Sequence, residues 1–401
     1  MTSTTAMPRE HFRTAVYPTP FHSRTSAANT LNLWHRWKDC TVADAYFDVA
    51  LEYAALRNAC AVFELSPIIK QRITGPDALP FLNRLMTREV GKIKPGRVGY
   101  AVWCNEEGQV IDDGTLFHLT PGVYRLCSQE RQLNWLHDSA FGFDVSITEE
   151  TYDIAALALQ GPTSCAVLKK LGLAGIEQLP PFALATFAFE GADLMISRTG
   201  FTGDLGYELW IAPSHAERLW DRLFEAGRLH GLKPMGTLAL EVSRIEAGFI
   251  QAGIDYVPAD QAVRPGRTRS PLELGLEWLV DFRKPNFTGR RALLAERQKG
   301  SRYRLVKLDI EGNKPAKDAF LYDRRRKGIG TVTSAVWSPA VKANIALASV
   351  QAPWGRPGDA LWAEIYYQKE LKWSRVMAKC RVVERPFYTP PRFRQTPAPD
   401  V

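Results

Sequence analysis

One pattern occurs twice in this chain, and it restricts the possible folds more than any other feature. Each copy is an apolar strand, a Gly-Pro break and a short amphipathic helix, and the copies span residues 73–85 and 159–171. Proline suits a helix start because its missing N–H would have no intrahelical partner there. A strand meander and a closing helix follow each copy, with the helices expected over 129–140 and 215–230. Residues 40–255 are therefore predicted to form two related, interleaved α/β units, unless the copies are unrelated βα segments.

The last third of the chain changes to a β pattern. Short β-branched and alternating runs are separated there by turns that contain Pro and Gly, which is typical of a barrel or sandwich. The predicted fold class is α+β, with a C-terminal β-barrel or jelly-roll-like domain. The expected organisation is a disordered N-terminal tail over residues 1–30, an α/β region over 31–290 whose second unit covers about 68–145, a barrel over 300–388 and a tail over 389–401.

Composition narrows the class of protein. The 401 residues are 45% hydrophobic and 23% charged, as in soluble globular proteins. The apolar runs are too short to cross a bilayer, and the N-terminus lacks the apolar core of a signal peptide. We therefore expect a cytoplasmic protein with no membrane partner.

Several kinds of chemistry find no support in the sequence. The six cysteines are scattered without a CxxC pair, which favours buried, reduced thiols over disulfides or a zinc site. No HExxH, P-loop or Ser/His/Asp arrangement is present. Metal-dependent hydrolysis and phosphate transfer are therefore not predicted, and no metal ligands are proposed.

The net charge of +8 comes from 51 basic and 43 acidic residues. Nucleic-acid binding is one interpretation of a basic chain. The basic residues are dispersed, however, and the tightest clusters, at 264–269 and 324–327, resemble solvated loops. A third interpretation is attraction of an anionic small ligand. We expect no nucleic-acid partner, and leave open whether loop 257–269 attracts an anion or is a mobile surface loop.

Three glycines between two apolar strands predict a tightly shaped loop. Gly200, Gly203 and Gly206 lie between a strand ending near Ser197 and a strand that carries Glu208. Glycine allows positive φ and close approach of other groups. Glu208 is either a solvated hairpin residue or a carboxylate that points into a pocket and binds a ligand.

An adjacent acid pair occurs in the other repeat unit. Strand alternation sends the side chains of Asp112 and Asp113 to opposite faces. One acid can therefore be solvated while the other faces the interior. Two units that face each other could bring one Asp and Glu208 to a shared cavity.

Several stretches, in order along the chain, resemble the aminomethyltransferase family, whose type member is the glycine-cleavage T-protein. Together they cover about residues 45–388 and are specific as a set. They are residues 75–76, 100–108, 110–113, 160–162, 197–203, 206–208, 244–247, 333–339 and 345–348. The resemblance implies three domains arranged around a central hole that binds tetrahydrofolate. The same family contains tetrahydrofolate-dependent demethylases, including those that act on dimethylsulfoniopropionate and on aryl methyl ethers.

The resemblance also implies roles for single residues. Asp113 matches the family's essential acid beside the reacting folate nitrogens, and Glu208 matches the carboxylate that holds the pterin. A carboxylate can accept both N–H bonds from the neighbouring pterin amino and ring groups. Tyr100 and Tyr388 match aromatic residues of the folate site. No metal is needed for such a transfer.

The departures from the family pattern concern the donor. Phe117 and Phe201 stand where tyrosines of the folate site are usual, and Leu240 stands in place of a ligand-binding arginine. These replacements remove two hydroxyls and one charge. We therefore expect the side of the central hole that receives the methyl donor to be more apolar. The expected function is a tetrahydrofolate-dependent one-carbon transferase, in preference a demethylase that uses a small S-, N- or O-methyl donor. The alternatives are a glycine-cleavage-type aminomethyltransferase, with a lipoyl carrier protein as a less favoured partner, and a non-catalytic folate-binding protein.

Overall fold

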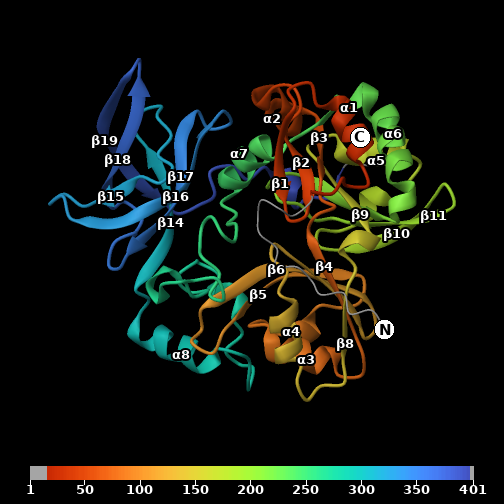
Figure 1. The fold of residues 1–401 in the computed structure, drawn as a ribbon, viewed down its shortest axis with the longest axis horizontal. Helices are drawn as coiled ribbons and strands as arrows, with labels where there is room; N and C mark the ends of the chain where they lie inside the picture. Colours follow the sequence, from red (N-terminus) through yellow and green to blue (C-terminus); the bar gives the residue numbers. More distant parts are fainter. Residues whose placement is uncertain (1–15, 398–401) are drawn as a thin grey trace, which may run out of the picture.

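The computed structural model describes residues 16–397, which form two large β-sheets with their helices, a two-stranded hairpin, a closed β-barrel and connecting segments. Figure 1 shows the barrel in blue on the left, a sheet in orange at the bottom and a second sheet in yellow and green on the right. Helix α7 (Thr237–Ala247) lies between the barrel and the second sheet. The predicted α+β class is confirmed.

The first sheet has five strands in the order β5-β6-β7-β4-β8. The strands are β4 (Ile69–Thr74), β5 (Arg97–Cys104), β6 (Val110–Thr120), β7 (Val123–Ser128) and β8 (Ser146–Glu149). Helices α3 (Ala78–Leu85) and α4 (Leu133–Ser139) cover one face. Phe81, Leu82 and Leu136 of these helices pack with Trp103 and Leu116 of the sheet, so this face holds the first core.

The second sheet has six strands in the order β10-β11-β12-β9-β3-β13. The strands are β3 (Cys60–Glu64), β9 (Ala155–Gln160), β10 (Leu184–Phe189), β11 (Ala192–Ser197), β12 (Gly206–Ile211) and β13 (Leu232–Pro234). Helices α5 (Ser164–Lys170) and α6 (Ala216–Gly227) pack on one face. Helices α2 (Val49–Asn58) and α7 pack near β3 on the other. A hairpin of β1 (Leu33–Trp37) and β2 (Cys40–Ala45) lies beside α7.

The two sheets repeat one arrangement. The order β5-β6-β7-β4 matches the order β10-β11-β12-β9, and β3 and β8 each join the sheet of the other repeat, so the units are interleaved. Gly75 and Gly161, the glycines of the two Gly-Pro breaks, both have φ of +120°. A Cβ at Gly75 would lie 2.5 Å from the carbonyl oxygen of Asp144, and one at Gly161 would lie 2.6 Å from that of Ala59. Only glycine fits either turn, so the predicted repeat is confirmed.

The C-terminal barrel is closed by six strands in the order β14-β17-β16-β15-β18-β19. They are β14 (Tyr303–Ile310), β15 (Phe320–Tyr322), β16 (Gly328–Ser338), β17 (Ala343–Gln351), β18 (Ala360–Lys369) and β19 (Lys372–Val383). The sequence pattern missed β15, because three residues are too few to show an alternation. A long connection that contains α8 (Arg290–Lys299) precedes the barrel.

Two expectations about the chain ends are corrected. Within the predicted tail of residues 1–30, α1 (His22–Ala28) is helical and the Phe21 side chain is fully buried in the core beneath α6. At the other end, a helical turn spans Pro391–Phe393, and Arg392 pairs with the buried Asp204. Both predicted tails therefore belong in part to the fold. Residues 1–15 and 398–401 lie outside the described residues.

All six cysteines are buried and free of disulfides, as predicted. Among the helices within residues 16–397, none is long and apolar enough to cross a membrane.

Candidate active site

Strand β6 separates the two acids of the Asp pair, as the alternation predicted. Asp112 lies opposite Trp103 of the helix-covered core, whereas Asp113 lies opposite Val102 on the other face. Asp112 is fully buried, and its carboxylate accepts the backbone N–H groups of Asp113 at 2.9 Å and Glu130 at 3.0 Å. Burial, with the nearby charge of Asp113, raises the pKa of Asp112 well above its usual range. Asp112 therefore supports the local backbone and leaves Asp113 as the acid of the opposite face.

Both oxygens of Asp113 accept tyrosine hydroxyls. Tyr100 on β5 donates to Oδ2 at 2.6 Å, and Tyr256, from the segment after α7, donates to Oδ1 at 2.5 Å. Burial raises the pKa of Asp113, and the two tyrosine hydrogen bonds oppose that rise. Two of the predicted site residues, Tyr100 and Asp113, are thus in contact. Tyr256 was missed, since it lies in a segment without periodic pattern.

Glu208 lies on β12 beside two hydroxyl residues of the preceding strand and loop. The Thr199 hydroxyl donates to its Oε2 at 2.5 Å, and the Ser197 hydroxyl lies 3.4 Å from the same oxygen. Burial raises the pKa of Glu208 to about 7, against the effect of these hydroxyls. Within the described part of the chain, no protein group donates a hydrogen bond to Oε1. That oxygen can accept a hydrogen bond from a ligand.

The glycine loop before Glu208 is shaped by Gln160, the last residue of β9. A Cβ at Gly200 would lie 2.0 Å from Gln160 Oε1, and one at Gly206 would lie 2.3 Å from Gln160 Cδ. The Gln160 amide donates to the carbonyl oxygen of Thr199 at 3.2 Å. The predicted tight loop is confirmed, and it holds the Thr199 hydroxyl against Glu208.

The two sheets meet face to face through aromatic side chains. Phe117 of β6 and Trp210 of β12 pack edge to face, with 5.3 Å between the ring centroids. Phe117 lies on the same side of β6 as Asp113, and Trp210 lies on the same side of β12 as Glu208. Burial raises the pKa of the Cys127 thiol on β7, and the charge of Glu208 adds to that rise. Each carboxylate therefore projects from its sheet toward the facing sheet.

Three of the predicted aromatic residues contact groups other than Asp113. Phe117 is fully buried at the contact between the sheets. Phe201 is 36% exposed and stacks on Phe249. The Tyr388 ring lies 4.4 Å from the Arg57 guanidinium, and its hydroxyl accepts a bond from Arg392 at 2.9 Å. The roles of Phe117, Phe201 and Tyr388 toward a cofactor stay predictions.

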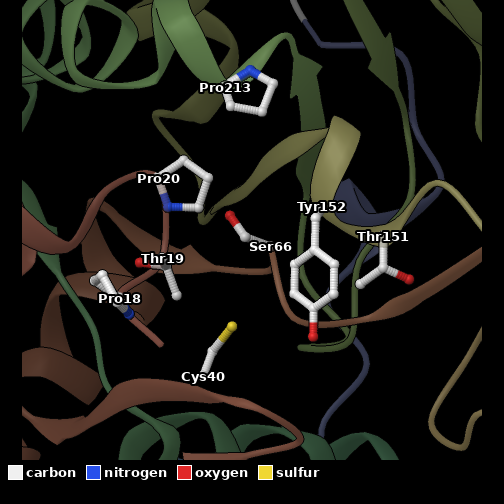
Figure 2. Close-up of a pocket in the computed structure, with 8 residues that line it drawn as sticks. All are labelled: Pro18, Thr19, Pro20, Cys40, Ser66, Thr151, Tyr152 and Pro213. Carbon is white, nitrogen blue, oxygen red and sulfur yellow. The ribbon is translucent and has the colours of Figure 1, made fainter. Parts of the chain in front are cut away.

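Two cavities of the structure are lined by neither Asp113 nor Glu208. One, of about 480 Å³, is lined in part by Trp278, whose ring centroid lies 6.1 Å from that of Tyr100. The other, of about 280 Å³, is shown in Figure 2 and contains none of the predicted site residues. It is lined by Pro18, Thr19, Pro20, Cys40, Ser66, Thr151, Tyr152 and Pro213.

Comparisons of this chain with known proteins agree on one family. Residues 17–284 match the GCVT N-terminal domain, and residues 304–389 match the glycine cleavage T-protein C-terminal barrel domain. An aminomethyltransferase of Halothermothrix orenii is 32% identical over 332 residues, 82% of this chain and 89% of that protein. A trimethylamine-oxide aldolase of Ruegeria pomeroyi is 36% identical over 312 residues, 75% of this chain and 38% of that protein.

A solved structure agrees with the sequence comparisons. The glycine cleavage system aminomethyltransferase T from Bartonella henselae superposes with a TM-score of 0.81 and 25% identity, and the match covers 94% of this chain and 99% of that one. With both domain models and a relative above 30% identity over most of the chain, the resemblance inferred from the motifs is confirmed. The chain belongs to the aminomethyltransferase family of enzymes, whose type member is the glycine-cleavage T-protein.

Proposed function

We propose that the chain is a tetrahydrofolate-dependent demethylase, which moves a methyl group from a small S-, N- or O-methyl donor to tetrahydrofolate. The observation that carries this proposal is the placement of Asp113 and Glu208 on facing sheets, each directed toward the other sheet. A ligand held by Glu208 and acted on by Asp113 requires both carboxylates to border one space.

The strand registers support a common space. When the two repeated sheets are aligned by these registers, Arg125 of β7 occupies the position of Glu208. Thr115 of β6 likewise occupies the position of Met195. The Arg125 guanidinium lies 4.0 Å from the Met195 sulfur. If the sheets are related by an approximate two-fold, Glu208 lies beside Thr115. Thr115 is two residues from Asp113, or about 7 Å along the strand.

The residues fit a pterin at Glu208. A pterin presents an amino group and a ring N–H side by side, and a carboxylate with a free oxygen can accept from both. Tetrahydrofolate, when bound, supplies the nucleophilic ring nitrogen that accepts the one-carbon unit. The hydroxyls of Thr199 and Ser197 hold one oxygen of Glu208 and so fix the orientation of the carboxylate.

Asp113 fits the role of the acid–base group. Its half-buried carboxylate is held by two tyrosine hydroxyls, so its orientation is set before a ligand arrives. In its ionised form it would stabilise positive charge that develops at the accepting nitrogen, or take the proton released there.

The surroundings of Glu208 support an apolar donor. Leu240, which stands in place of the family's arginine, packs on the cluster that contains Phe63 and Ala158. Ala158 is the cross-strand neighbour of Glu208. The similarity to a trimethylamine-oxide aldolase also points to a small methylated compound. A lipoyl-bound aminomethyl group, the donor of glycine-cleavage enzymes, fits this apolar surface less well.

The experiment is an incubation of purified protein with tetrahydrofolate and a panel of methylated sulfonium, amine, amine oxide and aryl ether donors. We expect 5-methyltetrahydrofolate, detected by mass spectrometry, with one class of donor. Aminomethyl-lipoyl carrier protein serves as the competing substrate. Turnover with that substrate alone would show that the activity is that of a glycine-cleavage-type aminomethyltransferase. Folate binding without turnover on any donor would favour a non-catalytic folate-binding protein.

A further inference from the structure

Two consecutive residues connect the C-terminal barrel to the acid on the first sheet. Asp255, which is 2% exposed, accepts the Arg244 guanidinium at 2.6 Å. Its other oxygen accepts the hydroxyls of Thr333 at 2.6 Å and Ser334 at 2.7 Å, both on barrel strand β16. The next residue, Tyr256, is the one whose hydroxyl reaches Asp113.

The connection formed by Asp255 and Tyr256 is short. Neighbouring Cα atoms lie about 3.8 Å apart, so a shift of Asp255 must move Tyr256 as well. The backbone around the pair is also fixed, because the Gln251 N–H donates to Asp255 at 3.0 Å and the Gly253 N–H donates to the Tyr256 carbonyl oxygen at 2.9 Å. The position of the barrel is thereby linked to the hydroxyl on Asp113.

We propose that Asp255 and Tyr256 form a link by which barrel residues Thr333 and Ser334 hold the Asp113 carboxylate in its working orientation. Tyr256 is then a positioning residue for Asp113, and Ser334 is a positioning residue one step further away. This inference rests on the proposed role of Asp113 in one-carbon transfer.

The charged and titratable groups around Asp113 determine how a change in the link alters the protonation of Asp113. They are Tyr100 and Tyr256, which donate hydrogen bonds, and the carboxylates of Asp112 and Asp255. The hydroxyls favour the ionised form of Asp113, whereas burial and the neighbouring carboxylates disfavour it. Loss of either hydroxyl, or its displacement, makes Asp113 bind a proton more tightly.

The first test is the pH profile of kcat/KM for Tyr256→Phe, which removes one hydroxyl and keeps the ring. We expect the acidic limb to move to higher pH by about one to two units, because the lost hydroxyl favours the ionised form of Asp113. An unmoved acidic limb would contradict the role given to Tyr256.

The second test separates the link from general damage to the barrel. Ser334→Ala removes a hydroxyl that reaches Asp255, and Ser338→Ala removes a hydroxyl of the same strand that reaches Glu246 instead. We expect Ser334→Ala to move the acidic limb in the direction of Tyr256→Phe, and Ser338→Ala to leave it in place. Thr333→Val is the substitute if Ser334→Ala does not fold. Equal shifts for the two serine variants would overturn the link.

A double-mutant cycle gives the most direct result. If Ser334 acts through Tyr256, adding Ser334→Ala to Tyr256→Phe moves the limb no further. Additive shifts would show that the barrel reaches Asp113 by another route and would overturn the proposal.

The ionisation of Asp113 can also be followed without turnover. Carbon-13 NMR of protein labelled at aspartate carboxyls, with Asp113→Asn for assignment, reports the protonation of Asp113 directly. A shift in Tyr256→Phe and Ser334→Ala together with inactivity on every donor would retain the link and reject the proposed function. An unchanged titration in an active enzyme would do the opposite.

Discussion

The rings of Phe117 and Trp210 meet edge to face at 5.3 Å and join two sheets that repeat the same strand order. Neither ring is more than 3% exposed. Asp113 lies four residues before Phe117, and Glu208 lies two residues before Trp210. The contact therefore joins the two sheet faces that carry Asp113 and Glu208.

Replacing Phe117 tests this role. Phe117→Ala should lower the free energy of unfolding by about 3–5 kcal/mol, because it removes a fully buried ring and leaves a cavity. It should also weaken tetrahydrofolate binding, since the sheets lose the contact that joins them. Denaturant unfolding and a fluorescence titration with folate measure the two effects. Phe141→Ala, at a 94% exposed phenylalanine, should change stability by no more than about 0.5 kcal/mol.

Asp113→Asn tests the proposed chemistry against a matched position of the repeat. The registers of both sheets make Asp193 on β11 the counterpart of Asp113, and Asp193 is exposed. Asp113→Asn should reduce turnover by about 10²–10⁴-fold, the usual value of general acid–base catalysis, and leave folate affinity nearly intact. Asp193→Asn should retain full turnover. Survival of activity in Asp113→Asn would remove the role given to this acid.

The repeat could be predicted because it depends on the backbone conformation of single glycine residues. Gly75 and Gly161 are each needed for a backbone angle that other residues rarely adopt, so the sequence displays the constraint directly. Helix α1 shows no such pattern, because its residues are mostly polar and its position depends on the adjacent Phe21 in a distant core. The docked C-terminal residues were missed for the same reason, since Arg392 depends on a partner 188 positions away.

The site was predictable to the extent that a motif marks it. Asp113, Glu208 and Tyr100 lie within strands that carry family motifs, so the sequence could name them, and their roles toward a folate stay predictions. Tyr256 lies 143 positions after Asp113 in an irregular segment. Its only signal in the sequence is a phenol beside an acid, which fits many surface loops. The contact that identifies it exists only after the first sheet and the barrel have come together.

The pH dependence of folding tests the burial of Glu208. Its pKa is about 7 in the folded chain against 4.5 ordinarily, so the folded state holds a proton more tightly than the unfolded state. Stability therefore falls as pH rises from about 4.5 to about 7, and the cost is complete above that window. Glu208→Gln should be more stable than the wild type by up to about 3 kcal/mol at about pH 8, with no gain at about pH 4.5.

The same variant tests ligand binding in the opposite direction. Folate affinity of the wild type should rise with pH up to about 7, because the ionised carboxylate is the better acceptor. Glu208→Gln should bind about tenfold more weakly above that pH and show little pH dependence. Glu64, whose pKa is also raised to about 7 by burial, is unchanged in both proteins, so their difference isolates Glu208. Equal affinities would place the pterin elsewhere.

The docking of residues 389–397 gives the last prediction. Arg392 donates to both oxygens of the buried Asp204, at 2.6 and 2.9 Å, and Arg57 pairs with the same carboxylate at 3.2 Å. Arg392→Ala leaves that carboxylate with one cation. A broken buried pair costs about 3–5 kcal/mol, but the Arg392 side chain is 35% exposed and Arg57 remains. We therefore expect a loss of about 1–2 kcal/mol in denaturant unfolding, after allowance for solvent screening. Arg394→Ala, at an exposed arginine of the same segment, should leave stability unchanged. Equal stabilities for the two variants would show that this segment is a tail after all.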